Sequence, residues 1–251
     1  YLFQDSPAMR RFKNIPFLPF FKKISKYFFE LLVVIFGVYL GFMANNYSDE
    51  LKQKQYIKAT IKEMYISLEH DIKDADLNRE GHYKGIESLK FFFRIVKGSE
   101  VDLDSFDQHL INITRSFISV QNTASFEALK SNGLSLIVND TLRTKIIKLY
   151  DFQYDMLEKI EEGYAESQLF KHFYPDLMNI IDKSLYYNDN LKLEKISRPL
   201  EISNEERSRL ILLLKRLWNT RYFNISVYDE VIGDMQDLRT SLENVYPNIK
   251  M

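Results

Sequence analysis

Four histidines and the absence of cysteine limit the chemistry that this sequence can perform. His70, His82, His109 and His172 are never four residues apart with an acid between them, the spacing of a helical zinc site. With no cysteine, disulfides, cysteine-based zinc sites and thiol chemistry are excluded. We therefore expect core or surface roles for all four histidines, and no metal or cofactor.

Motifs for nucleotide binding and hydrolysis are also missing. The sequence contains no G-x-x-x-x-G-K-[ST], no G-x-G-x-x-G and no G-x-S-x-G. Glu69, Asp71 and Asp74 lie among lysines in a helical pattern, and we interpret them as a solvent-exposed helix face. A net charge of −1 gives no concentrated basic surface for nucleic acid. The sequence predicts a protein that is neither an enzyme nor a nucleic-acid binder.

One ionisable residue, Glu30, lies inside an apolar run over residues 27–46. From residue 31 to residue 44 the run contains no charge. A helix needs about 17–25 mostly apolar residues to cross a hydrocarbon core of about 30 Å. Carboxylates inside such a helix are costly and usually face protein or water. We predict a transmembrane helix over residues 27–46, with the lipid bilayer as its first partner.

Glu30 shares one face of this helix with small residues. Steps of three and four residues place five residues on that face: Glu30, Val34, Gly37, Gly41 and Ala44. The two glycines form a G-x-x-x-G, which lets two helix backbones approach closely in lipid. This face is a candidate packing site for a second copy or another membrane protein. Two simpler interpretations stay open. Glu30 can reach the headgroups or pair with Lys26, and the glycines can be ordinary membrane-helix glycines.

The residues before the run predict its orientation. Six basic residues lie between Arg10 and Lys26, with no acid between residues 5 and 30. By the positive-inside rule the tail, residues 1–26, stays in the cytoplasm and the residues after the span are translocated. The aromatic segment at 15–21 suits the membrane interface. Met9 is a candidate native start, which sets residues 1–8 apart. Cleavage after residue 44 would need a small residue where Phe42 stands, so we expect an uncleaved anchor.

The remaining residues, 47–251, predict helices and few turns, because glycine (8) and proline (6) are scarce. Apolar steps of three and four predict a stalk that continues the span to about residues 78–81. Further helices are expected over about 82–97, 102–117, 123–132, from 139 toward 174, and from the capping box at Ser203 to about 246. Residues 134–138 can be a strand or a helical turn, and 186–202 a loop, with or without a short extended piece. The predicted fold class is all-α: one transmembrane helix continuing into a stalk and an extracytoplasmic antiparallel bundle.

Two blocks of the sequence resemble a family of uncharacterised bacterial single-pass membrane proteins. In ELLVVIFGVYLGFMANNYSDELKQKQ, the matching residues are Glu30, Val33, Val34, Gly37, Asn45, Asn46 and Glu50. Tyr47 stands where the family has tryptophan, and Phe29 replaces a glycine. SFEALKSNGLSLIVNDTLRTKIIKLYD resembles the family's short helix, turn and asparagine-capped helix. The resemblance implies a bacterial inner-membrane protein with a helical periplasmic domain, and it implies no activity.

Three functions fit these features. The first is an anchored helical subunit that self-associates or docks on a cell-envelope complex. The second is a single-pass sensor, although fewer than 30 residues precede the span and leave no room for a cytoplasmic output domain. The third is an ion-pathway component in which several Glu30 side chains surround a pore. We favour the first, because no catalytic constellation competes with the packing face.

Overall fold

The computed structural model describes the backbone of residues 17–250 and the side chains of residues 27–250. The chain is mostly helical, with 78% helix and 3% strand, which confirms the predicted class at that level. It divides into two compact units, residues 1–56 and 57–251, and both contain part of helix α1. The side chains of the predicted basic tail lie outside the described residues.

Helix α1 is continuous from Phe17 to Val96. A stretch from Tyr27 onward is long and apolar enough, by length and composition, to cross a membrane, and none of it is buried in the chain. The predicted stop near residues 78–81, with a separate helix over 82–97, is wrong. Gly98 ends α1 instead. Its φ of +75° suits glycine, and its amide donates to the Ile95 carbonyl at 2.9 Å.

Short elements connect α1 to the next long helix. They are η1 (Leu103–Ser105), α2 (Phe106–Thr114), α3 (Ala124–Asn132) and η2 (Leu134–Leu136). The Asp102 side chain caps η1 by accepting from the Asp104 amide at 3.1 Å. Helix α2 stops before the predicted end at residue 117, and residues 115–123 form neither helix nor strand. Gly133, with a φ of +100°, ends α3, and the ambiguous run after it forms a 3₁₀ turn.

The helix predicted from residue 139 begins as expected but ends early. The Asn139 side chain accepts from the Leu142 amide at 2.9 Å. The helix then alternates between α and π geometry through α4 (Asp140–Ile147), η3 (Lys148–Gln153), α5 (Tyr154–Glu158) and η4 (Lys159–Gly163). It therefore ends at Gly163 and not near residue 174. Pro175 lies in the first turn of a separate helix.

Small elements and one long helix complete the chain. They are α6 (Leu169–His172), α7 (Tyr174–Ile181), η5 (Asp182–Ser184), β1 (Leu185–Tyr187), β2 (Leu193–Ile196) and α8 (Asn204–Val245). Strands β1 and β2 form an antiparallel hairpin in which Leu185 pairs with Ile196. The predicted capping box at the start of α8 is confirmed. The Glu206 amide donates to the Ser203 side chain, and the Glu206 carboxylate accepts from the Ser203 amide.

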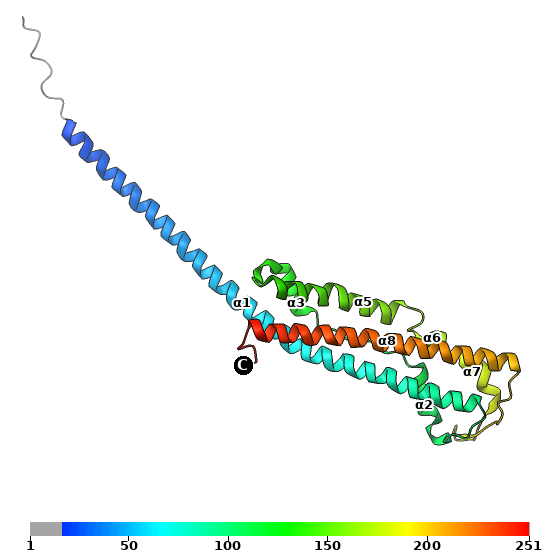
Figure 1. The fold of residues 1–251 in the computed structure, drawn as a ribbon. Helices are drawn as coiled ribbons and strands as arrows, with labels where there is room; N and C mark the ends of the chain where they lie inside the picture. The colour runs from blue at the N-terminus through cyan, green and yellow to red at the C-terminus, as the bar shows by residue number, and fades with distance from the viewer. Residues whose placement is uncertain (1–16, 251) are drawn as a thin grey trace, which may run out of the picture. The chain divides into compact units, whose positions relative to one another are not determined.

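Two clusters of buried apolar side chains form the core of residues 57–251. One packs α1 side chains such as Leu68 against α3, α4, α5 and the second half of α8. The other packs the end of α1 against α2, α7 and the first half of α8, around Phe106 and Leu217. Within this unit α8 lies alongside α1 (Figure 1). Polar contacts join the two helices at Tyr65 with Glu243, Glu69 with Arg239, Arg79 with Asp229 and the Val96 carbonyl with Arg207.

Candidate functional site

The packing face predicted within the apolar segment 27–46 lies on α1 and is open. Its members Glu30, Val34, Gly37, Gly41 and Ala44 are all exposed. A Cβ atom added to Gly37 or Gly41 would meet no atom within 4 Å. Nothing in the described chain therefore covers the two glycines, and a second helix backbone has room to approach them.

Asp71 and Asp74 do not form the solvent-exposed face that the sequence predicted. Asp71 is 2% exposed and Asp74 is half-buried. Both carboxylates accept hydrogen bonds from the segment 115–123. Asp71 accepts from the Asn122 amide at 3.2 Å and from the Tyr154 hydroxyl at 2.8 Å. Asp74 accepts from the Val120 amide at 2.9 Å. These two acids therefore hold a loop in place.

Glu161, in the π-helical segment η4, is the third carboxylate on this loop. It is 6% exposed and accepts from the Ser119 amide and hydroxyl, both at 2.9 Å, and from the Tyr228 hydroxyl. Buried backbone amides without hydrogen-bond partners are costly. A segment that forms neither helix nor strand must therefore bond its amides to side chains or other groups. Burial, the largest effect, raises the pKa of Asp71 and of Glu161, and the hydrogen bonds that they accept oppose this rise.

Arg221 of α8 is a buried cation that satisfies the end of α2. It is 0% exposed, and its guanidinium donates to the carbonyl oxygens of Asn112, Ile113 and Arg115 at 2.9, 3.2 and 2.8 Å. The last carbonyls of a helix have no partner within it and favour positive charge. Burial lowers the pKa of Arg221 to about 9, so the group remains charged at neutral pH. Arg221 thus acts as a side-chain cap from another helix.

His82 and Gly85 of α1 lie against this guanidinium, and Gly81 lies against the Phe117 ring. Nδ1 of His82 lies 3.1 Å from Nη1 of Arg221, and it accepts because arginine only donates. Burial and the Arg221 charge lower the pKa of His82 to about 3. A Cβ atom on Gly85 would lie 2.6 Å from Nε of Arg221, and one on Gly81 would lie 2.2 Å from the Phe117 ring. The helix runs through both glycines because they give these side chains space.

Ser88 and His109 form a pair whose geometry opposes nucleophilic chemistry. Oγ of Ser88 lies 3.0 Å from Nδ1 of His109, but its hydroxyl donates to the Lys84 carbonyl at 2.9 Å. Nδ1 must then carry the proton and donate, whereas a general base has to accept the serine proton. Ser88 is 0% exposed, and the His109 ring stacks on Phe91 with centroids 4.1 Å apart. The pair connects α1 to α2.

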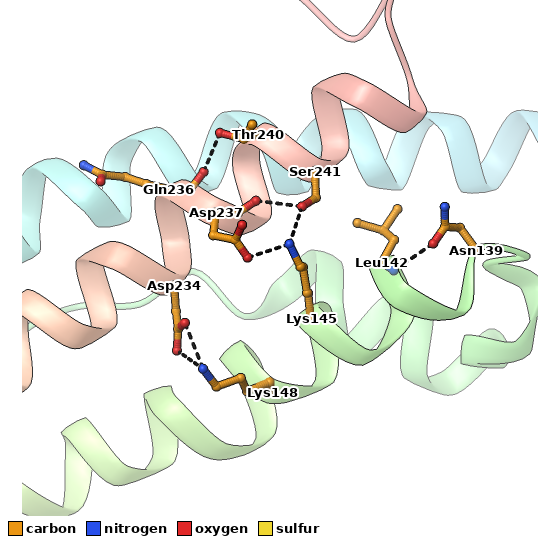
Figure 2. A network of polar contacts seen from close by, with 9 residues as sticks. All are labelled: Asn139, Leu142, Lys145, Lys148, Asp234, Gln236, Asp237, Thr240 and Ser241. Carbon is orange, nitrogen blue, oxygen red and sulfur yellow. Dashed lines mark hydrogen bonds and ion pairs between the residues drawn. The ribbon is translucent and has the colours of Figure 1, made fainter.

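The π-helical segment η3 directs polar side chains toward α8. Gln153 is 0% exposed, and its amide donates to Asp234 at 2.7 Å. Figure 2 shows two ion pairs to α8, Lys148 of η3 with Asp234 and Lys145 of α4 with Asp237, both at 2.7 Å. Segments of π-helix frequently occur at functional sites. Here η3 carries contacts between helices.

The sequence did contain a signal for the buried polar residues that the prediction missed. They continue the helical spacing of buried apolar residues. Asp71 lies three residues after Leu68, and Arg221 lies four residues after Leu217, and both leucines are fully buried. A residue at that spacing faces the core whatever its charge. The prediction that Asp71 is solvent-exposed relied on its charge and not on its position along the helix, and it is wrong.

Comparisons with known proteins add no relative. A scan against models of protein families finds no match, and searches of curated proteins and of solved structures find no similar chain. The resemblance of residues 30–55 and 125–151 to bacterial single-pass membrane proteins therefore stays a prediction.

Proposed function

We propose that this chain is a non-enzymatic, membrane-anchored helical subunit that self-associates or docks on a complex of the bacterial cell envelope. Residues 27–46 would span the inner membrane with the N-terminus in the cytoplasm. Residues 47–251 would form an antiparallel helical bundle in the periplasm. One observation carries the proposal: the apolar stretch of α1 is exposed all round, so lipid or another protein must cover it.

The contacts between α1 and α8 support the antiparallel bundle. Tyr65 contacts Glu243, whereas Val96, later in α1, contacts Arg207, earlier in α8. The buried polar groups support a structural role, because Asp71, Glu161 and Arg221 bond to backbone groups of residues 112–122. These hydrogen bonds hold the backbone of residues 112–122 in place.

The open glycines support assembly through the membrane helix. Helices in lipid associate through close packing, for which Gly37 and Gly41 leave room. We expect Gly37→Leu or Gly41→Leu to disrupt assembly, because the larger side chain separates the two backbones. Tyr39→Leu lies about half a turn away on the helix, where 3.6 residues make one turn, and should leave assembly intact.

The chain contains no cysteine, so single cysteines introduced along residues 30–44 can map the contact by cross-linking in membranes. The proposal predicts strong cross-linking at positions on the glycine face and weak cross-linking opposite it. A pattern without helical periodicity, unchanged by leucine at both glycines, would mean that the helix is only an anchor.

The response to changes at Glu30 separates packing from ion conduction. Glu30→Gln keeps the shape and hydrogen-bonding ability, so a packing role predicts a milder loss of assembly than for Glu30→Leu. Equal losses with glutamine and leucine would show a need for charge or protonation, and would favour the ion-pathway alternative.

A further inference from the structure

The core of the folded domain consists of two apolar clusters with a polar layer between them. Along α1, the buried apolar side chains up to residue 75 belong to one cluster, and those from residue 89 onward belong to the other. Along α8 the order is reversed, with the change between residues 217 and 227. We call the first the α4 cluster and the second the α2 cluster, after a helix that contributes to each. Figure 1 shows α3 and α5 toward one end of the α1–α8 pair, and α2 and α7 toward the other.

The polar layer is formed by the four segments that connect the two clusters, which are residues 76–88 of α1, 115–123, 164–168 and 218–226 of α8. The first and the last are helical, and the other two form neither helix nor strand. Their buried polar side chains are His82, Ser88, Ser119, Ser167, Thr220, Arg221 and Asn224. Their two buried apolar residues, Ile86 and Ile225, join neither cluster. The clusters are therefore joined through a layer in which polar groups prevail.

Hydrogen bonds hold this layer together. Oγ of Ser116 donates to the Ser167 carbonyl and accepts from the Leu169 amide, both at 2.9 Å. Arg221 donates to carbonyl oxygens at the end of α2, and the described residues give it no carboxylate partner. Water replaces such hydrogen bonds when a segment opens, so each contributes little net free energy. Water also stabilises the Arg221 charge, which favours opening at the layer.

Burial of apolar side chains, by contrast, links the elements within each cluster. The α2 cluster packs α2, α6 and α7 against the end of α1 and the start of α8, around Phe106 and Leu217. Removing one of these elements would expose apolar surface on the others, so we expect them to open together. Among the described residues, the α4 cluster contains more buried side chains and should be the more stable of the two.

We infer that the polar layer divides the domain into two cooperative units, so that the elements of the α2 cluster open together in a rare state in which the α4 cluster remains folded. This partly open state would expose Phe106 and Leu217, while the α4 cluster keeps the remaining parts of α1 and α8 paired. The two units follow from the packing of residues 57–251 alone, whatever the function of the chain.

Hydrogen exchange of the full chain in phosphatidylcholine nanodiscs, read by mass spectrometry, measures the opening of each segment. Amides of α2, α7 and residues 210–217 should share one protection factor. Amides of α4, α5 and residues 231–242 should share a second one, at least about tenfold higher. Because α8 is one continuous helix, the step must fall within residues 218–226. A single protection factor for both sets, or a gradual rise from the start of α8 as in fraying, would overturn the inference.

Two matched variants test which unit opens first. Ile113 of α2 and Ile146 of α4 are both 0% exposed, and each belongs to one cluster. Ile146→Val should accelerate exchange by about two- to tenfold in the α4 set and leave the α2 set unchanged. The reason is that the partly open state still contains the packed Ile146 side chain, so the variant weakens the native and the partly open state equally. Ile113→Val should accelerate both sets, because complete unfolding also breaks its contacts.

Two other results with these variants would contradict the inference. Equal acceleration of both sets by Ile146→Val would show that the domain opens only as a whole. If Ile146→Val accelerated both sets and Ile113→Val only the α2 set, the α4 cluster would open first, which is the reverse of the inferred order.

Discussion

Gly85→Ala should destabilise the folded domain by about 1–3 kcal/mol, although alanine usually stabilises the interior of a helix relative to glycine. The added Cβ atom would lie 2.6 Å from Nε and 2.9 Å from Cζ of Arg221. The Arg221 guanidinium cannot move aside easily, because it is fully buried and bonded to three carbonyl oxygens. Urea unfolding of the full chain in nanodiscs, followed by circular dichroism, measures the change.

Alanine at two other glycines should change the stability by different amounts. Gly81→Ala should cost less than Gly85→Ala, because its clash is with the far edge of the Phe117 ring, which is half-buried and can turn outward. Gly233→Ala, in α8, should instead stabilise the domain by about 0.5–1 kcal/mol, since its added Cβ atom meets nothing within 4 Å. A stabilising change at both Gly85 and Gly233 would contradict the close approach of Arg221.

Acidification from pH 7 to pH 4 should lower the free energy of unfolding by about 3 kcal/mol through His82 alone. The pKa of His82 is about 3 in the folded state and 6.5 ordinarily, so the unfolded chain binds more protons in this range. The stability is therefore present above pH 6.5 and is lost as the pH falls from 6.5 toward 3. Protonation of Nδ1 would also remove the acceptor of the Arg221 hydrogen bond and place two cations together.

His82→Asn isolates this contribution, because the asparagine oxygen can take the place of Nδ1 as acceptor and does not titrate. The unfolding free energy of the wild type minus that of the variant should decrease as the pH falls, because only the wild type loses the His82 contribution. Asp71 and Glu161, whose pKa values are raised, favour the folded state more at lower pH, but both proteins contain them and their effect cancels. Parallel profiles for wild type and His82→Asn would contradict the prediction.

Periodicity and capping predicted most helices of this fold. The start of α8 follows from Ser203 and Glu206, which supply both halves of a capping box. The stripe that includes Ile61, Met64 and Leu68 is buried as expected, because spacing alone decides which face of an amphipathic helix turns inward. The helix that is long and apolar enough to cross a membrane also follows from the sequence, since length and apolar composition are local properties.

The parts that sequence reasoning missed depend on contacts between distant segments. From the sequence, Gly81 is a plausible end of a helix. In the structure it lies inside α1, and the ring of Phe117, which is far away in the sequence, occupies the space that a Cβ atom would take. Helix α2 stops early because Arg221 reaches its last carbonyls from α8. The packing face at Glu30, Gly37 and Gly41 could be proposed from spacing, and in the described chain no atom lies within 4 Å of a Cβ atom added to either glycine.

The orientation of the membrane helix tests the central claim most directly. Val138→Cys places a single thiol at a domain residue that is 91% exposed, and Lys13→Cys places one in the basic tail. A membrane-impermeant maleimide is applied to intact and to permeabilised spheroplasts. The account predicts that Val138→Cys is labelled in intact spheroplasts, whereas Lys13→Cys is labelled only after permeabilisation. The reverse pattern, or a protein that alkaline carbonate washes off the membrane, would contradict a chain anchored with its helical domain outside.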